Sequence, residues 1–241
     1  MPRLPNFIII GEQKCGTTTL NCTLQQHRSI FTPLKEVHFF DRHYKRGYTW
    51  YKNLFRNVKP NLICGEKTPT YFYIDGCLKR ISENIPNVKL IIMLRNPVDR
   101  AVSYYRSNKK IYNIPFSKAV NKGKNFIGNF NNTKSYNEFH FLNRGIYFKQ
   151  LEKCYKLFPN ENIFVYVLEK FIKFQETYLD HIQLNLGVNR ELKELLHVNV
   201  ARRPDKTTIN EKRQLHKLYK PYNAKLFDIL GYEIKEWNKY E

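Results

Sequence analysis

The chain has 241 residues, 42% of them hydrophobic and 15% aromatic, which is enough for one domain with a sizeable core. Its 41 lysines and arginines outnumber 21 acidic residues and give a formal net charge of +20. Such a surplus predicts an anionic partner: nucleic acid, an acidic membrane surface, or a polyanionic or phosphorylated substrate. The longest apolar runs are far too short to span a bilayer, so no membrane segment is expected.

The five cysteines are scattered, and none of them stand in CxxC pairs. This pattern indicates neither a zinc site nor a disulfide framework, and it fits reduced thiols in a reducing compartment. We read no secretory signal before the first apolar run, because "MPRLPN" leads directly into "FIII". The expectation is therefore a cytoplasmic location by default.

Short apolar runs alternate with segments of helical period along the chain. The runs predict buried strands of the kind found in parallel sheets, at residues 7–10, 62–64, 89–94 and 162–168. The periodic segments predict helices at residues 16–27, 97–109, 144–158 and 174–186, with one or two more at 209–230. The alternation predicts an α/β fold of three layers, with a central parallel sheet, flanking helices and right-handed crossovers, as a single domain over residues 1–241.

Two local features complete this outline. Asn96 followed by Pro97 is a favourable helix opening, and Asp99 is well placed in the first turn. Residues 112–140 are polar and rich in Asn and Lys, so we expect a loop or flexible insert there.

The stretch "IIIGEQKCGTTTL", residues 8–20, runs from a predicted strand through a glycine turn into a predicted helix. Free backbone N–H groups and the positive end of the helix make such a turn an anion-binding site. Gly11 and Gly16 have the spacing of a Walker A loop. However, Thr17 stands where the Walker lysine should follow, and Lys14 lies two residues before the second glycine.

The end of the predicted strand at residues 89–94 also differs from that of an ATPase. Arg95 stands where an ATPase typically has an aspartate that helps to hold magnesium. A lysine cradle without an evident metal-binding carboxylate suits transfer of a group less charged than phosphoryl. A sulfonate, with one negative charge, is such a group.

Motifs in a fixed order resemble those of sulfotransferases that use 3′-phosphoadenosine 5′-phosphosulfate (PAPS) and have a P-loop-like fold. "GEQKCGTTTL" looks like their 5′-phosphosulfate loop, and "LRNPVDRAVSYY" looks like their 3′-phosphate motif. "KEVHFFD", "YKRGYTWY" and "GEKTPTYF" are similar to the glycosaminoglycan branch, and most of all to heparan sulfate 3-O-sulfotransferases. "RGIYFKQLEKCYKLFPNENIFVY" and "LYKPYNAKLFDILGYEIKEW" extend the resemblance over most of the chain.

This resemblance implies how the first turn would bind the donor. The hydroxyls of Thr17 and Thr18, with the backbone amides around Cys15 and Gly16, would hold the 5′-phosphosulfate by hydrogen bonds. Lys14 would lie against the bridging oxygen and neutralise charge as the phosphate leaves.

The resemblance also assigns the other end of the cofactor. Arg95 and Ser103, eight residues apart, would bind the 3′-phosphate. Taken alone, Arg95 and Arg100 also fit surface ion pairs, with Ser103 as a helix-surface hydroxyl. In "VARRPDKTT" the family has a basic loop that closes over the cofactor, and Arg202 or Arg203 would fill that role.

A third group of residues would act on the acceptor. Glu36 and His38 are two residues apart, so their side chains share a face in an extended segment. The resemblance makes Glu36 the general base, with His38 positioning or polarising, Asp41 supporting the acceptor site and Lys67 stabilising the transferring sulfonate. His38, which has apolar neighbours on both sides, equally fits a partly buried imidazole.

The sequence departs from the animal enzymes in two respects. Those enzymes carry a disulfide-bonded hairpin just before the basic loop, but no cysteine follows Cys154 here, so we expect the hairpin to be absent or trimmed. They also carry a membrane anchor and work in the Golgi lumen. A domain excised from a Golgi luminal enzyme is therefore the alternative to a cytoplasmic protein.

The leading interpretation is transfer of sulfonate from PAPS to a hydroxyl or amine of an anionic or neutral glycan, with no metal ion. A small-molecule or protein acceptor is the alternative. A P-loop phosphotransferase is disfavoured by the misplaced lysine and the absent strand-end aspartate. A basic nucleic-acid-binding protein would cluster its basic residues on one helix or tail, whereas here they are spread along the chain, so no nucleic-acid partner is expected.

Overall fold

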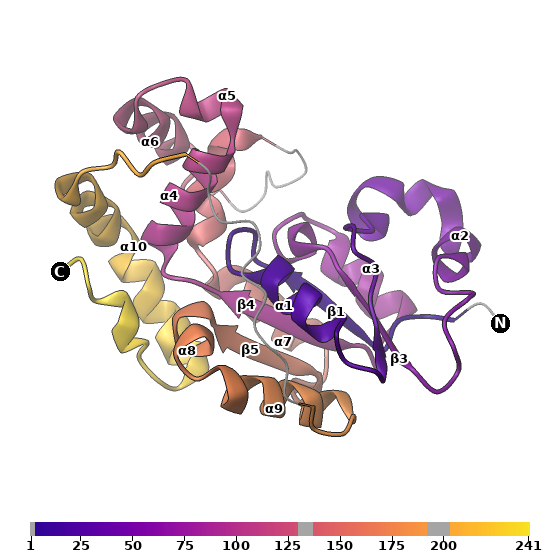
Figure 1. Cartoon of the computed structure of the whole chain (residues 1–241). Coiled ribbons are helices and arrows are strands. Elements are labelled where there is room, and N and C mark those ends of the chain that lie inside the picture. Colours follow the sequence, from indigo (N-terminus) through magenta and orange to yellow (C-terminus); the bar gives the residue numbers. More distant parts are fainter. Residues whose placement is uncertain (1–2, 130–136, 192–202) are drawn as a thin grey trace. The chain divides into compact units, whose positions relative to one another are not determined.

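The computed structural model describes residues 3–129, 137–191 and 203–241 (Figure 1). The chain divides into two compact units, one made of residues 1–94 and 154–199 and the other of residues 95–153 and 200–241. A single domain over the whole chain stays a prediction.

The first unit is built on a five-stranded parallel sheet (Figure 1). Its strands, in the spatial order β2-β3-β1-β4-β5, are β2 (Ile30–Phe31), β3 (Ile63–Lys67), β1 (Phe7–Gly11), β4 (Lys89–Leu94) and β5 (Ile163–Val167). All four predicted strands are present, so the α/β fold with a central parallel sheet is confirmed. The sequence missed β2, because two residues are too few to show any periodicity.

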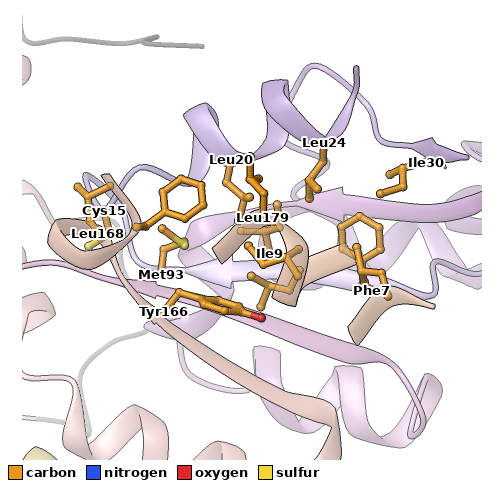
Figure 2. Packing of buried hydrophobic residues seen from close by; sticks show 14 residues of the cluster. Phe7, Ile9, Cys15, Leu20, Leu24, Ile30, Met93, Tyr166, Leu168 and Leu179 are labelled. Carbon is orange, nitrogen blue, oxygen red and sulfur yellow. The ribbon is translucent and has the colours of Figure 1, made fainter. Parts of the chain in front are cut away.

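Among the described residues, three whole helices of the first unit lie between these strands in the chain, and two more follow β5. They are α1 (Thr17–Leu24), α2 (Gly47–Asn53), α3 (Cys77–Asn84), α8 (Leu168–Lys173) and α9 (Gln175–Leu186). Side chains of α1, α8 and α9 pack with those of β1, β4 and β5 in one apolar cluster (Figure 2). Each fully buried aliphatic or aromatic side chain contributes about 1.5–3 kcal/mol. Because the cluster includes side chains of both β1 and α1, it holds in place the two elements that flank the glycine turn.

The second unit is helical. Its helices are α4 (Pro97–Ser107), α5 (Lys109–Tyr112), α6 (Phe116–Lys124) and α10 (Ile209–Leu230), and it also contains the first part of α7 (Phe148–Leu157). As predicted, Asn96 caps α4, since its side-chain oxygen accepts a hydrogen bond from the Val98 N–H at 2.9 Å. A capping box between Thr208 and Glu211 opens α10.

One sequence expectation for this unit was wrong. Residues 112–140 were expected to be a loop or flexible insert, but they contain α6, which buries Phe116, Ala119 and Gly123 on one face. Their spacing of three and four residues is helical, and the surrounding lysines obscured it. The helix predicted at residues 97–109 is present as α4 and ends two residues earlier, at Ser107, because Asn108 is extended and caps α5.

Within the described residues, no helix combines the length and the apolar character needed to cross a lipid bilayer.

The close approach of β1 and β3 depends on the absence of a side chain at Gly65. Gly65 lies beside Phe7 in the strand pairing, and a Cβ there would lie 2.2 Å from the Phe7 ring. We expect Gly65→Ala to lower the free energy of unfolding by about 1–3 kcal/mol through overpacking, measured by urea denaturation. Phe7→Leu should relieve the clash, so the double variant should lose less stability than the sum of the two single variants. Strict additivity would contradict this account.

Candidate active site

The turn between β1 and α1 adopts a strained local backbone. Lys14 has a φ of 71° and Gly16 a φ of 82°, both in the left-handed region. A Cβ on Gly16 would lie 2.6 Å from the Leu168 side chain, so only glycine fits this position without displacement. The turn is tied to β4 by a hydrogen bond from the Glu12 N–H to the Met93 carbonyl at 2.8 Å.

The N-terminus of α1 has the features of an anion site. No side chain caps it, and its first i to i−4 hydrogen bond runs from the Leu20 N–H to the Gly16 carbonyl at 3.0 Å. The amides before Leu20 therefore have no partner within the helix, and they carry the positive end of the helix dipole. Thr17 is buried and Thr18 half-buried at this end. The donor set of amide N–H groups and threonine hydroxyls fits a phosphosulfate.

Lys67, the last residue of β3, links this loop to a second group of residues. Its side chain is 5% exposed. The Nζ atom donates to Thr18 Oγ1 at 3.3 Å and to Glu36 Oε1 at 3.1 Å. The structure thus brings together a hydroxyl at the start of α1, a buried ammonium and the carboxylate predicted to be the base.

Glu36, His38 and Asp41 form a continuous polar chain. His38 Nε2 lies 3.0 Å from Glu36 Oε2, and His38 Nδ1 lies 2.9 Å from Asp41 Oδ2. Asp41 Oδ2 also accepts a hydrogen bond from the Thr70 hydroxyl at 2.5 Å. His38 has a φ of 54°, a left-handed backbone conformation that residues other than glycine rarely adopt.

The electrostatics of this chain favour charged side chains. Burial alone would lower the pKa of His38, but its hydrogen bonds to Asp41 and Glu36 outweigh burial and raise the pKa to about 9. Burial alone would raise the pKa of Glu36, but the hydrogen bond from His38 and the charge of Lys67 outweigh it and lower the pKa. At neutral pH the site therefore holds an imidazolium beside an ionised carboxylate.

Sequence reasoning missed the polar residues that surround Lys67. Glu66 is completely buried, and burial raises its pKa to about 7 while hydrogen bonds from Tyr51, Thr68 and Tyr71 act to lower it. The motif "GEKTPTYF" contains three of these four residues. The usable signal was the acidic Glu66 and the hydroxyls beside it directly after a buried strand, but only Lys67 was given a role.

The remaining predicted cofactor residues belong to the second unit. Arg95 directly follows β4 and is half-buried, and its carbonyl accepts a hydrogen bond from the Tyr147 hydroxyl at 2.8 Å. Ser103 is half-buried on α4. Arg100 is completely buried, so it is not a surface residue, and it donates to the Phe141 carbonyl.

The basic loop is only partly described. Arg202 and the region where the family hairpin was expected to be missing lie outside the described residues. Arg203 is described: its guanidinium lies 4.2 Å from the centroid of the Tyr112 ring, and its carbonyl accepts a hydrogen bond from Arg106 Nε at 2.7 Å. Its assignment to the cofactor stays a prediction.

Comparison with known families agrees with this geometry. A family model described as the sulfotransferase domain matches residues 4–200, and the chain belongs to this family. Human heparan sulfate glucosamine 3-O-sulfotransferase 3B1 is 29% identical over 260 residues, an alignment that covers 96% of this chain and 65% of the relative. Human heparan sulfate glucosamine 3-O-sulfotransferase 6 is 31% identical over 189 residues, or 78% of this chain and 54% of the relative. The chain thus spans less than two thirds of the length of these relatives.

Solved structures support the fold. A sulfotransferase from Alicyclobacillus acidocaldarius superposes with a TM-score of 0.82 at 24% identity, covering 98% of this chain and 100% of the other. The sulfotransferase domain from the curacin biosynthetic pathway has a TM-score of 0.55 at 18% identity, covering 78% and 76%. At these identities the likeness concerns the fold.

The raised pKa of His38 predicts a pH-dependent contribution to stability. Because the pKa is about 9 in the folded protein and 6.5 ordinarily, this contribution is complete below pH 6.5 and is lost as the pH rises through 9. We expect His38→Asn to lower the free energy of unfolding most near pH 6, with the deficit shrinking by pH 9.5 in urea titrations. A deficit that does not change with pH would show that His38 is not held as a cation.

Proposed function

We propose that the protein is a PAPS-dependent sulfotransferase that transfers a sulfonate group to a hydroxyl or amine of a carbohydrate. The observation that carries the proposal is the set of contacts from Thr18 through Lys67 to Glu36 and His38. These contacts join an anion-binding loop to a carboxylate suited to accept a proton. Membership of the sulfotransferase family supports the same reaction.

The first unit would bind the sulfated end of the donor. PAPS, when bound, supplies a sulfonate on a phosphate leaving group. The amides at the start of α1 and the hydroxyls of Thr17 and Thr18 would bind this end, as the uncapped helix allows. Lys14 would neutralise the charge that develops on the leaving phosphate. We assign the 3′-phosphate to Arg95 and Ser103.

Glu36 would act as the general base. Its carboxylate is ionised at neutral pH and would accept the proton of the acceptor hydroxyl as the new S–O bond forms. His38 would hold the carboxylate in place through its Nε2 contact, while Asp41 fixes the other ring nitrogen. Lys67, between loop and base, would stabilise negative charge on the sulfonate oxygens. We expect no metal ion, since β4 is followed by Arg95 rather than an acid.

For the acceptor, we propose a glycosaminoglycan-like glycan. The relatives that match most of this chain are named for sulfation of glucosamine in heparan sulfate. A formal net charge of +20 would attract a polyanionic chain of that kind.

Incubation with labelled PAPS and a panel of glycans, phenols and peptides tests the acceptor assignment. Label should enter an anionic glycan, and exclusive labelling of a phenol or peptide would overturn the assignment.

The role of Glu36 can be separated from cofactor binding. We expect Glu36→Gln to lower kcat by about 10²–10⁴-fold, the range for loss of a general base, with little change in the affinity for adenosine 3′,5′-bisphosphate. Glu83→Gln is the matched control, because Glu83 lies exposed on α3 and pairs only with Lys79 among the described residues. Normal turnover by Glu36→Gln would show that another group takes the proton.

Lys14 and Arg95 should be needed for binding itself. We expect Lys14→Ala and Arg95→Ala each to lower the affinity for adenosine 3′,5′-bisphosphate by roughly 10- to 100-fold, as loss of a charge-assisted hydrogen bond does. Thermal unfolding with increasing ligand measures this as a smaller rise in Tm. Lys79→Ala, at an exposed position of α3, is the control. Wild-type ligand stabilisation in either variant would remove that residue from the site.

A further inference from the structure

The backbone that directly follows the proposed base is held by side-chain hydroxyl groups from a distant part of the chain. Thr68 Oγ1 accepts hydrogen bonds from two consecutive amides, those of Val37 at 3.1 Å and His38 at 3.2 Å. Thr68 lies directly after β3, thirty residues further along the chain. One hydroxyl thus fixes the segment on the C-terminal side of Glu36.

A second hydroxyl continues this pattern. The Tyr71 hydroxyl accepts hydrogen bonds from the Phe39 N–H at 2.7 Å and from the Phe40 N–H at 3.3 Å. The four successive backbone N–H groups of residues 37–40 therefore all donate to two side-chain hydroxyls of the segment after β3. The left-handed backbone of His38 lies within this run, and such a conformation persists only where its surroundings impose it.

Both hydroxyls donate their proton to the same carboxylate. Thr68 Oγ1 donates to Glu66 Oε2 at 2.7 Å, and the Tyr71 hydroxyl donates to Glu66 Oε1 at 3.3 Å. Tyr51 gives Glu66 Oε1 a third hydrogen bond at 2.7 Å. Because a hydroxyl has a single proton, donation to Glu66 leaves the oxygen lone pairs of Thr68 and Tyr71 for the amides.

This arrangement is costly as a purely structural device. Glu66 is 0% exposed, and among the described residues no lysine, arginine or histidine forms an ion pair with it. Burying a carboxylate without a cation disfavours folding, and well-packed apolar side chains could fill the same volume at lower cost. A buried carboxyl group kept at this position, with three hydroxyls directed at it, points to a requirement for the orientation that it imposes.

We propose that Glu66 is a positioning residue that acts through Thr68 and Tyr71 to fix the backbone of residues 37–40, and so to orient His38 and Glu36. The consequence for catalysis rests on the proposed function, but the orientation itself does not. Without the acceptor oxygen of Thr68, the amides of residues 37 and 38 lose their partner. The His38 ring then leaves its place between Glu36 and Asp41.

The test compares variants that differ in one hydroxyl. Thr68→Val removes the acceptor at almost constant volume, and Thr68→Ser keeps it. Thr32→Val is a matched control, since Thr32 is also buried and its hydroxyl makes no hydrogen bond within the described residues. Glu66→Gln is the second probe. The side-chain NH₂ group of glutamine is a donor, so it cannot accept the hydroxyl proton of Thr68 or Tyr71 as the carboxylate oxygen does.

The readout is the titration of the His38 ring by NMR in the protein without ligand, assigned with His38→Asn. We expect the His38 pKa to fall from about 9 toward 6.5 in Thr68→Val and Glu66→Gln, and to stay near 9 in Thr68→Ser and Thr32→Val. In the transfer assay, Thr68→Val should lower kcat by about 10- to 100-fold, as a displacement near 1 Å does, with unchanged affinity for adenosine 3′,5′-bisphosphate.

A His38 pKa near 9 in folded Thr68→Val would overturn the proposal, whatever the loss in Tm. If Glu66→Gln does not fold, the comparison of Thr68→Val with Thr68→Ser decides alone. A wild-type protein that transfers no sulfonate from PAPS would overturn the proposed function instead. In that case the His38 titration still tests the positioning role.

Discussion

The Lys67 ammonium, held between Thr18 Oγ1 and Glu36 Oε1, is the contact on which the rest of the site depends. It is buried, so its charge must be compensated locally, and Glu36 provides the compensation. Against the effect of burial, and together with the hydrogen bond from His38, the charge of Lys67 lowers the pKa of Glu36 and favours its ionised form. The same lysine joins the proposed base to the start of α1.

Glu66 and Lys67 are consecutive residues at the end of β3, and both are buried. Because successive side chains of a strand point to opposite faces, Glu66 and Lys67 lie on different sides of the same backbone. Lys67 contacts the loop and the base, while Glu66 organises the hydroxyls that hold the segment from residue 37 to residue 40. A short stretch of strand thus supplies both the charge of the site and its rigidity.

The sequence predicted the parts of this design that depend on local pattern. The strands at residues 7–10 and 89–94 are uninterrupted apolar runs, and the glycine turn at residue 16 is marked by its spacing. The grouping of Glu36, His38 and Lys67 was expected only through resemblance, since it depends on contacts across some thirty residues. Such contacts leave no periodic signal. Glu66 stands in the motif "GEKTPTYF", but its contacts with the segment at residues 37–40, through Thr68 and Tyr71, are equally distant in sequence. The prediction missed α6 for a simpler reason, because the lysines between its apolar residues obscured the helical spacing.

The central claim is that the turn before α1, with its lysine displaced from the Walker position, binds a sulfated or phosphorylated adenylate without a divalent ion. Isothermal titration calorimetry of the wild-type protein tests it most directly, with adenosine 3′,5′-bisphosphate in EDTA compared with magnesium ATP. The account predicts saturable binding of the bisphosphate and much weaker binding of magnesium ATP. Tight binding of magnesium ATP with no heat from the bisphosphate would contradict it.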